Sequence, residues 1–135
     1  MKKINPFLEE NAIAVANWLT TCPAVDKVFF VGLDSHPSKA IVDKQCTGYG
    51  GMISFTLKDA SKVRRALCDY KMIMFAESLG GVQTLITYPL TQTHASIPKE
   101  GRDSIGITEN LLRLSVGIED KDDIIADLAS VLGDL

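Results

Sequence analysis

One arginine stands in the middle of an apolar, strand-like segment and is the best candidate for ligand chemistry. Alternate residues of a strand point to opposite faces, so Arg113 shares a face with Leu111 and Ser115. A guanidinium in this setting needs an anionic partner, and its planar fork matches a carboxylate in a bidentate geometry. The partner could be one of the chain's 17 acidic residues. The pattern alone favours such an internal ion pair over a bound ligand.

A second candidate is the segment Glu77–Gly81, with the sequence ESLGG. It follows an apolar run at 72–76, so Glu77 stands where a strand is expected to end. Ser78 places a hydroxyl at the entrance of a turn, and the paired glycines permit positive φ or a close approach of backbone to a ligand. Taken alone, the glycines favour a plain tight turn.

The other reactive residues point more weakly to function. His94 could act as an acid or base, but such a loop histidine more often bonds to backbone, and His36 is interpreted in the same way. The glycines at 48–51 lead into a strand rather than a helix, so we reject a phosphate-binding loop and expect Tyr49 to be structural. Three widely spaced cysteines and two histidines predict neither a disulfide framework nor a metal site.

Composition narrows the class of protein. The 135 residues, 46% hydrophobic and 23% charged, predict one folded domain with its own core. A net charge of −3 argues against nucleic acid or an anionic membrane as a partner. No apolar run approaches the roughly 20 residues of a membrane span, and the start lacks the apolar stretch of a secretory signal. Because the cysteines fit reduced thiols, we expect a cytoplasmic protein.

Helical and extended patterns interleave along the chain. Apolar spacing predicts helices at 11–19, with Trp18 off the apolar stripe, and at 122–132, with acidic residues at the start. The run 28–31 is typical of a strand buried on both faces. Further strands are expected at 52–57, 72–75, 82–87 and 111–116, and further helices after a capping Asp59 and at 98–105.

These elements predict an α+β fold. The extended segments within 72–87 are joined too tightly for helical crossovers. We therefore expect a mixed, mainly antiparallel sheet with helices packed on it.

Segments over most of the chain, from about Asn11 to Leu132, resemble the Cys/Met-metabolism PLP-dependent (transsulfuration) enzymes. This family includes cystathionine gamma-synthase, cystathionine gamma- and beta-lyase and methionine gamma-lyase. The similar segments, in chain order, are NA with VA and WL (11–19), GLDSHP (32–37), GGMISF (50–55), ESLGG (77–81), THA (93–95) and LRLSVGIED (112–120). The resemblance implies that 11–135 is the C-terminal substrate-binding domain of a fold-type-I PLP enzyme, and that 1–10 is a start outside the family.

The resemblance also implies roles for three residues. The family's arginine that matches Arg113 binds the substrate α-carboxylate, which reverses the preference for an internal ion pair. Ser78 would contribute beside it, and Glu77 would lie near the distal part of the substrate. Glu77 resembles the gamma-synthase or gamma-lyase pattern more than that of beta-lyase. Gln83-Thr84 departs from the Glu-Ser common in the family, which leaves the fine substrate assignment open.

The cofactor-binding part of such an enzyme is not expected in this chain. The family holds pyridoxal 5'-phosphate on a lysine followed by an aromatic residue, and none of the ten lysines here precedes Phe, Tyr or Trp. We therefore expect no catalytic or cofactor-binding residue here, a missing N-terminal PLP domain, and an inactive isolated chain.

The implied parent is a homotetramer acting on sulfur-containing or O-acyl amino acids in methionine biosynthesis or cysteine metabolism. It would be a transferase like cystathionine gamma-synthase, with the three lyases as alternatives. A free-standing, non-catalytic remnant that binds the parent enzyme or an amino acid is a further alternative.

Overall fold

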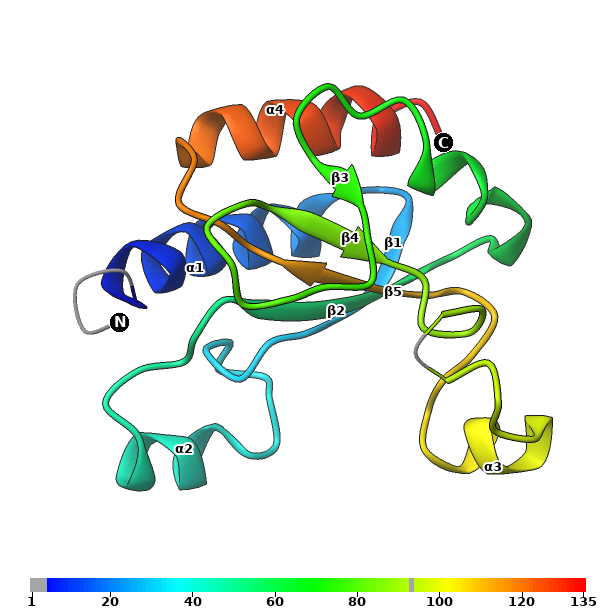
Figure 1. The fold of residues 1–135 in the computed structure, drawn as a ribbon. Coiled ribbons are helices and arrows are strands. Elements are labelled where there is room, and N and C mark those ends of the chain that lie inside the picture. Colours follow the sequence, from blue (N-terminus) through cyan, green and yellow to red (C-terminus); the bar gives the residue numbers. More distant parts are fainter. Residues whose placement is uncertain (1–4, 93) are drawn as a thin grey trace.

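Figure 1 shows the fold in a computed structural model, which describes residues 5–92 and 94–135. A five-stranded sheet has the order β1-β2-β5-β4-β3. The strands are β1 (Val25–Phe29), β2 (Met52–Leu57), β3 (Met74–Phe75), β4 (Leu85–Thr87) and β5 (Leu111–Ser115). The helices are α1 (Asn5–Thr21), α2 (Lys39–Gln45), α3 (Lys99–Ser104) and α4 (Lys121–Leu132), with 3-10 turns η1 (Ala60–Lys62) and η2 (Arg65–Leu67).

The sheet is mixed and mainly antiparallel, which confirms the predicted α+β class. β2 pairs with β1 and with β5, and β4 with β5, all antiparallel, whereas β3 pairs with β4 in parallel. Residues 76–84 connect the two parallel strands without a helix. The short connection is possible because β3 is only two residues long and stands at the edge of the sheet.

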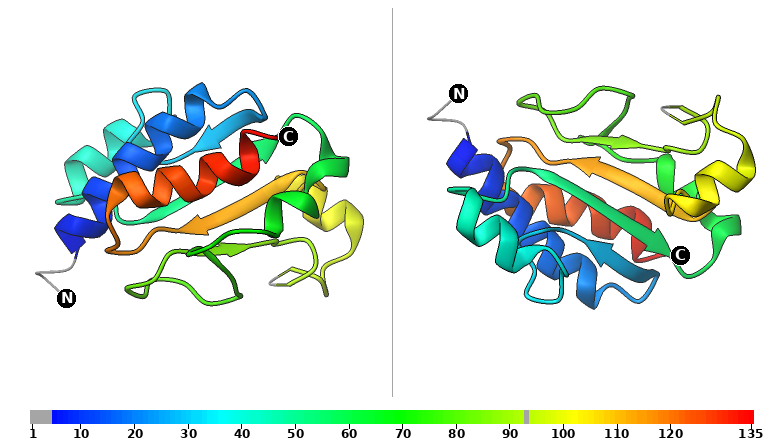
Figure 2. Two further views of the ribbon diagram at one scale, coloured as in Figure 1. Left: turned by 90° about the horizontal axis from the view of Figure 1, so that it is seen from above. Right: turned by 90° about the horizontal axis from the view of Figure 1, so that it is seen from below.

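Two long helices cover one face of the sheet and leave the other face open between smaller lobes. α1 and α4 lie side by side above the strands in Figure 1, and the view from below in Figure 2 shows the strands between α2 and α3. The predicted stripe of α1 is buried, as are Ile124, Leu128 and Val131 of α4. These side chains meet the helix-facing residues of the central strands, among them Ile53, Phe55, Ile86, Leu112 and Leu114.

Two local expectations are wrong. The apolar run 28–31 is not a strand buried on both faces: β1 ends at Phe29, lies at the sheet edge, and leaves that side chain 44% exposed, whereas Phe30 turns into the core. An apolar run does not show where a strand lies in the sheet, so the pattern could not distinguish an edge strand from a central strand. Asp59 does cap the next segment, since its Oδ1 accepts from Ser61 N at 2.9 Å, but two 3-10 turns follow instead of one helix.

One buried carboxylate fixes the approach to β3. Asp127 on α4 accepts hydrogen bonds from the backbone N–H groups of Lys71, Met72 and Ile73 at 2.8, 2.9 and 2.9 Å. The residue is only 6% exposed. It therefore ties the strand that precedes the ESLGG segment to the helical layer.

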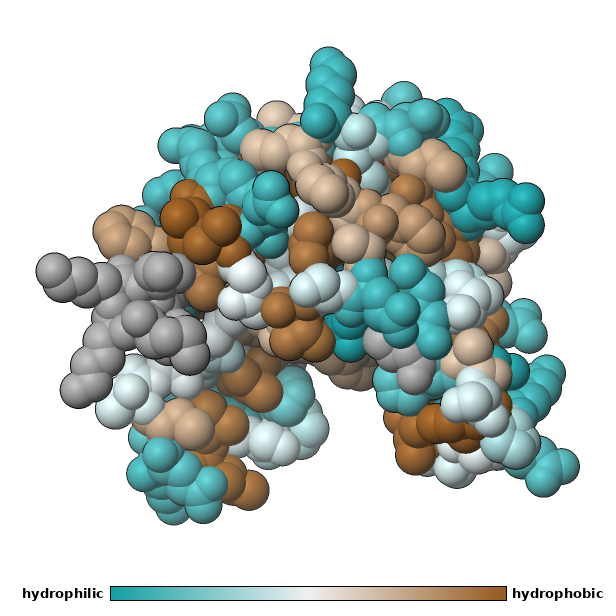
Figure 3. Space-filling model, viewed as in Figure 1, coloured by the Kyte–Doolittle hydropathy of each residue, from teal (hydrophilic) through white to brown (hydrophobic). Residues whose placement is uncertain are grey.

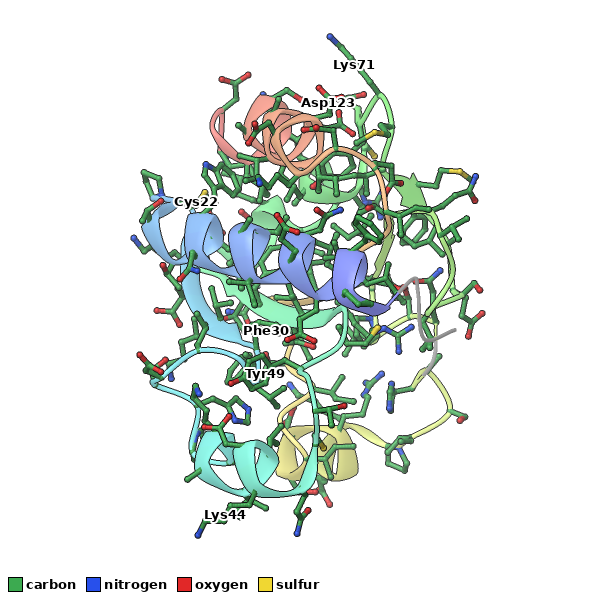
Figure 4. All side chains as sticks on the ribbon, turned by 90° about the vertical axis from the view of Figure 1, so that its left-hand side faces the viewer. Cys22, Phe30, Lys44, Tyr49, Lys71 and Asp123 are labelled. Carbon is green, nitrogen blue, oxygen red and sulfur yellow. The ribbon has the colours of Figure 1, made fainter. Side chains whose placement is uncertain are left out.

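The α2 lobe is held by aromatic packing and local polar contacts. The Tyr49 ring packs edge-on against Phe30 with a centroid distance of 6.3 Å. Figure 4 shows the two labelled residues beside each other. The Tyr49 hydroxyl donates to Asp43 at 2.7 Å and accepts from Lys39 at 3.0 Å. The structural role predicted for Tyr49 is confirmed. No helix in the described part of the chain is long and apolar enough to cross a membrane.

Candidate functional site

The sheet face opposite α1 and α4 carries Arg113 near its centre. Arg113 is the third residue of β5, and it stands opposite Ser54 of β2 and Thr87 of β4. Directly paired residues point to the same side of a sheet, so these three side chains share the open face. Leu112 and Leu114, which flank Arg113, are fully buried against the helices. Strand periodicity thus holds the half-buried arginine out from the core, as predicted.

Arg113 contacts neutral oxygens in the fold. Its Nη2 donates to the backbone carbonyl of Glu77 and to Thr87 Oγ1, both at 3.4 Å. These distances lie beyond the usual 2.7–3.2 Å range, so both bonds are weak. None of the ion pairs within the described residues involves Arg113, and those residues include every Asp and Glu of the chain. The internal ion pair favoured by the pattern alone is therefore wrong, and the guanidinium can take an external anion.

A loop brings the ESLGG segment to the same face. Residues 76–84, here called the Glu77 loop, leave β3, run along the β3–β4 edge of the sheet, in front of the strands in Figure 1, and return to β4. Gly80 N–H donates to Ser115 Oγ at 2.9 Å, and Ser115 shares the face of Arg113. Gly80 has φ +72, a conformation that favours glycine. The positive φ expected of these glycines is thus confirmed at Gly80, which lies beside the strand of the arginine.

The side chains of Glu77 and Ser78 are exposed on this loop. The backbone carbonyl of Glu77, not its carboxylate, meets Arg113. Within the described residues, neither side chain forms a hydrogen bond or an ion pair. The structure therefore brings the segment and the arginine together and leaves the carboxylate and hydroxyl accessible to a ligand.

Two members of the site were not singled out from the sequence. Thr87 Oγ1 donates to Ala76 O at 2.7 Å while it accepts from Arg113, so it links the arginine to the outgoing end of the Glu77 loop. The alternation along the strand does place Ser115 on the face of Arg113, but it gives Ser115 no role in the site. Thr87 could not have been found from the sequence, because a pairing of β4 with β5 puts it opposite a residue 26 positions away.

The other candidates take local roles. His36 Nδ1 accepts from Ser38 N at 3.2 Å, which confirms its predicted backbone contact. The backbone of His94 bonds to Pro89 O and Ile97 N at 3.0 and 3.1 Å, and the backbone contact expected of its side chain stays a prediction. The glycines at 48–51 lead into β2, as expected. Among the described residues, no three His, Cys, Asp or Glu side chains are placed to hold a metal ion.

Arg113 lies on an open surface rather than inside a closed pocket. Figure 3 shows a recess beneath the sheet, between the lobes that carry α2 and α3. A hollow of about 800 Å³ lies elsewhere, between the first half of α1 and residues 45–50. Binding sites normally bury most of a small ligand. A small anion on Arg113 would therefore need a further surface to enclose it.

The open face of this α+β sheet thus carries an arginine that pairs with no carboxylate of the described residues. Residues 7–133 match the family described as Cys/Met metabolism PLP-dependent enzyme. The chain belongs to this family.

Several relatives show the extent of the match. The chain is 48% identical over 122 residues to a cystathionine beta-lyase of Lactococcus lactis subsp. cremoris (strain MG1363). The aligned region covers 90% of this chain and 32% of that protein. The chain is 46% identical over 125 residues to a cystathionine gamma-lyase of Dictyostelium discoideum, covering 92% and 32%. The chain thus spans about a third of the length of these curated relatives.

Solved structures share the fold. A cystathionine gamma synthase from Xanthomonas oryzae pv. oryzae, in complex with aminoacrylate and cysteine, has a TM-score of 0.94 at 39% identity. A cystathionine gamma-lyase from Lactobacillus plantarum, complexed with L-serine, has a TM-score of 0.92 at 34% identity. Each covers 98% of this chain, which matches 34% and 35% of the two structures. The structural neighbours are fold-type-I PLP enzymes.

Proposed function

We propose that residues 11–135 form the C-terminal, substrate-binding part of a PLP-dependent transsulfuration enzyme acting on sulfur-containing or O-acyl amino acids. The observation that carries the proposal is Arg113, which stands on the open face of the sheet with no carboxylate of this chain within ion-pair distance. Its two weak bonds to neutral oxygens hold the side chain in place. A substrate carboxylate offers a charged, bidentate partner that those oxygens do not.

Each of the three residues has a distinct role in this proposal. Arg113 binds the substrate α-carboxylate, and Ser78, on the loop that meets Arg113, supports it. Glu77 stands at the distal end of the substrate. The exposed position of both loop side chains supports their access to a ligand. No residue of this chain is assigned a proton-transfer step.

The residues described here do not fit a cofactor cradle. Among the described residues, no lysine contacts Arg113 or the Glu77 loop. The glycines at 48–51 precede a strand, whereas a phosphate group is typically bound at the N-terminus of a helix. Pyridoxal phosphate supplies the electron sink for amino-acid chemistry when it is bound. The proposal therefore assigns its lysine to a separate N-terminal domain and treats the isolated chain as inactive.

The particular reaction we propose is that of cystathionine gamma-synthase, supported by Glu77 and by the synthase structure at a TM-score of 0.94. Cystathionine lyase activity is the alternative, because the beta-lyase and gamma-lyase relatives are 48% and 46% identical. Methionine gamma-lyase activity and a free-standing, non-catalytic remnant remain further alternatives. A cytoplasmic homotetramer completes the proposed parent enzyme.

The test is steady-state kinetics on the full-length enzyme that contains this chain. Arg113→Ala removes two charge-assisted bonds of about 1.5–3 kcal/mol each, so kcat/KM is expected to fall by about 10²–10⁴. Arg113→Lys keeps the charge but loses the fork, and should give an intermediate loss. Arg65→Ala, an exposed arginine on η2, is the matched control and should leave kcat/KM unchanged. An unchanged ratio in Arg113→Ala would refute the carboxylate role.

Inactivity of the chain alone has its own test. The purified 135-residue chain, mixed with pyridoxal phosphate, should form no cystathionine from an O-acyl homoserine and cysteine, and should release neither cysteine nor homocysteine from cystathionine. Measurable turnover would show that a cofactor-binding group lies within this chain.

A further inference from the structure

The Glu77 loop has an outgoing limb, residues 76–77, and a return limb, residues 82–84. The return limb is fixed by a buried polar contact that the proposed substrate-binding roles do not use. We propose that Thr84 and Glu119 form a positioning pair, which sets the place of the Glu77 loop relative to Arg113. This inference rests on the proposed function, because it concerns the same carboxylate site. Neither residue touches Arg113 in the fold, so both act through the loop.

Thr84 meets the Glu119 carboxylate through two groups. Its backbone N–H donates to Oε1 at 2.6 Å, and its hydroxyl donates to Oε2 at 2.8 Å. The same hydroxyl accepts from Gly117 N–H at 2.9 Å. Thr84 is fully buried. Since a buried polar group without its partner is destabilising, all three bonds hold the loop to the end of β5.

Glu119 is itself fixed to the helical layer. Asn11 of α1, only 8% exposed, donates through Nδ2 to Gly117 O at 3.0 Å and to Glu119 O at 2.7 Å. Ile118 N–H donates to Val82 O at 2.9 Å, which adds a backbone tie between the same two segments. A Cβ on Gly117 would overlap the Val82 carbonyl and lie 2.6 Å from Gln83 C. The return limb thus has close packing as well as hydrogen bonds.

The outgoing limb has fewer attachments. Arg113 reaches it only through the 3.4 Å bond to Glu77 O, while Thr87 holds Ala76 O at 2.7 Å. When Arg113 turns to a substrate carboxylate, the bond to Glu77 O competes with the ligand for the same guanidinium. The Thr84–Glu119 contact does not involve Arg113, so it persists and keeps Gly80 against Ser115. A loop freed from this contact should weaken substrate binding and leave the chemical step nearly intact.

The experiment compares Thr84→Val with Thr84→Ser. Valine keeps the shape of threonine but removes the hydroxyl, whereas serine keeps the hydroxyl. In the 135-residue chain and in the full-length enzyme, amide hydrogen exchange at Gly80 is expected to speed up about tenfold or more in Thr84→Val. The amides of 71–73, held by Asp127, are the internal control and should not change. In the enzyme, KM should rise about tenfold with kcat within about twofold, and Thr84→Ser should restore both.

Either of two results would overturn the proposal. The first is Gly80 exchange at the wild-type rate in Thr84→Val. The second is faster exchange with an unchanged KM, which would leave the contact purely structural. If Thr84→Val does not fold, Glu119→Gln replaces it, because glutamine can still accept from Thr84 N but places an amide group toward the Thr84 hydroxyl. Its Gly80 exchange and KM should move in the same direction.

Arg113→Ala, measured beside these variants, separates a failure of the proposed carboxylate site from a failure of the positioning pair. An unchanged KM in Arg113→Ala refutes the carboxylate site itself. Unchanged Gly80 exchange in Thr84→Val refutes only the positioning pair.

Discussion

Removal of the charge on Asp127 should be among the most destabilising single-atom changes in this fold. The carboxylate accepts three backbone hydrogen bonds at 2.8, 2.9 and 2.9 Å while it is 6% exposed. A hydrogen bond to a charged acceptor contributes about 1.5–3 kcal/mol, and a neutral one about 1 kcal/mol. Asp127→Asn leaves at most two neutral bonds and turns an NH₂ group toward a backbone N–H. We expect a loss of about 2–4 kcal/mol in the free energy of unfolding.

The assay is urea denaturation of the 135-residue chain, followed by circular dichroism at neutral pH. The midpoint should fall while the slope stays constant, since the area exposed on unfolding is the same. Asp123→Asn is the matched control: it lies one turn earlier on α4 and is exposed, so its loss should be less than about 1 kcal/mol. Figure 4 shows Asp123 near the end of the molecule that carries Lys71. Equal losses in the two variants would refute the account of 71–73 as a segment held by Asp127.

Two further predictions concern other parts of the chain. Gly117→Ala should lower the free energy of unfolding by about 1–3 kcal/mol in thermal unfolding, because its Cβ would meet the Val82 carbonyl. The Cβ of Gly80→Ala would meet open space, so this variant should lose only about 1 kcal/mol, for its positive φ. Equal losses in the two variants would contradict the packing argument. Hydrogen bonds from Lys39 and Tyr49 lower the pKa of Asp43, so its contribution to stability is present above the ordinary carboxyl range and is lost as pH falls through the folded-state pKa. In an NMR titration, Tyr49→Phe should raise the pKa of Asp43, and no movement would show that the hydroxyl has no such role.

The strongest predictions from the sequence concern elements whose pattern is local. The α1 stripe and the strands at 52–57 and 111–116 were predicted from spacing alone, because each buries one face against the same apolar layer. The segment after Asp59 was harder. Its apolar spacing fits a helix, but the chain forms two 3-10 turns, with Ala66 fully buried and the Tyr70 hydroxyl bonded to Ala66 O at 2.8 Å. Tertiary contacts outweigh a helix preference of this size.

The sequence by itself determined that Arg113 leaves the core side of its strand, because the period of a strand is two residues whatever surrounds it. It did not determine what the guanidinium meets there, and its pattern alone favoured a carboxylate of this chain. Only the tertiary structure placed neutral oxygens at that position: the antiparallel pairing of β4 with β5 puts Thr87 opposite Arg113, and the loop that joins β3 to β4 brings the Glu77 carbonyl there. The same loop returns to β4 through Thr84, which meets Glu119. Side-chain direction along a strand is a local property, whereas the choice of neighbour depends on contacts between residues 26 to 36 positions apart.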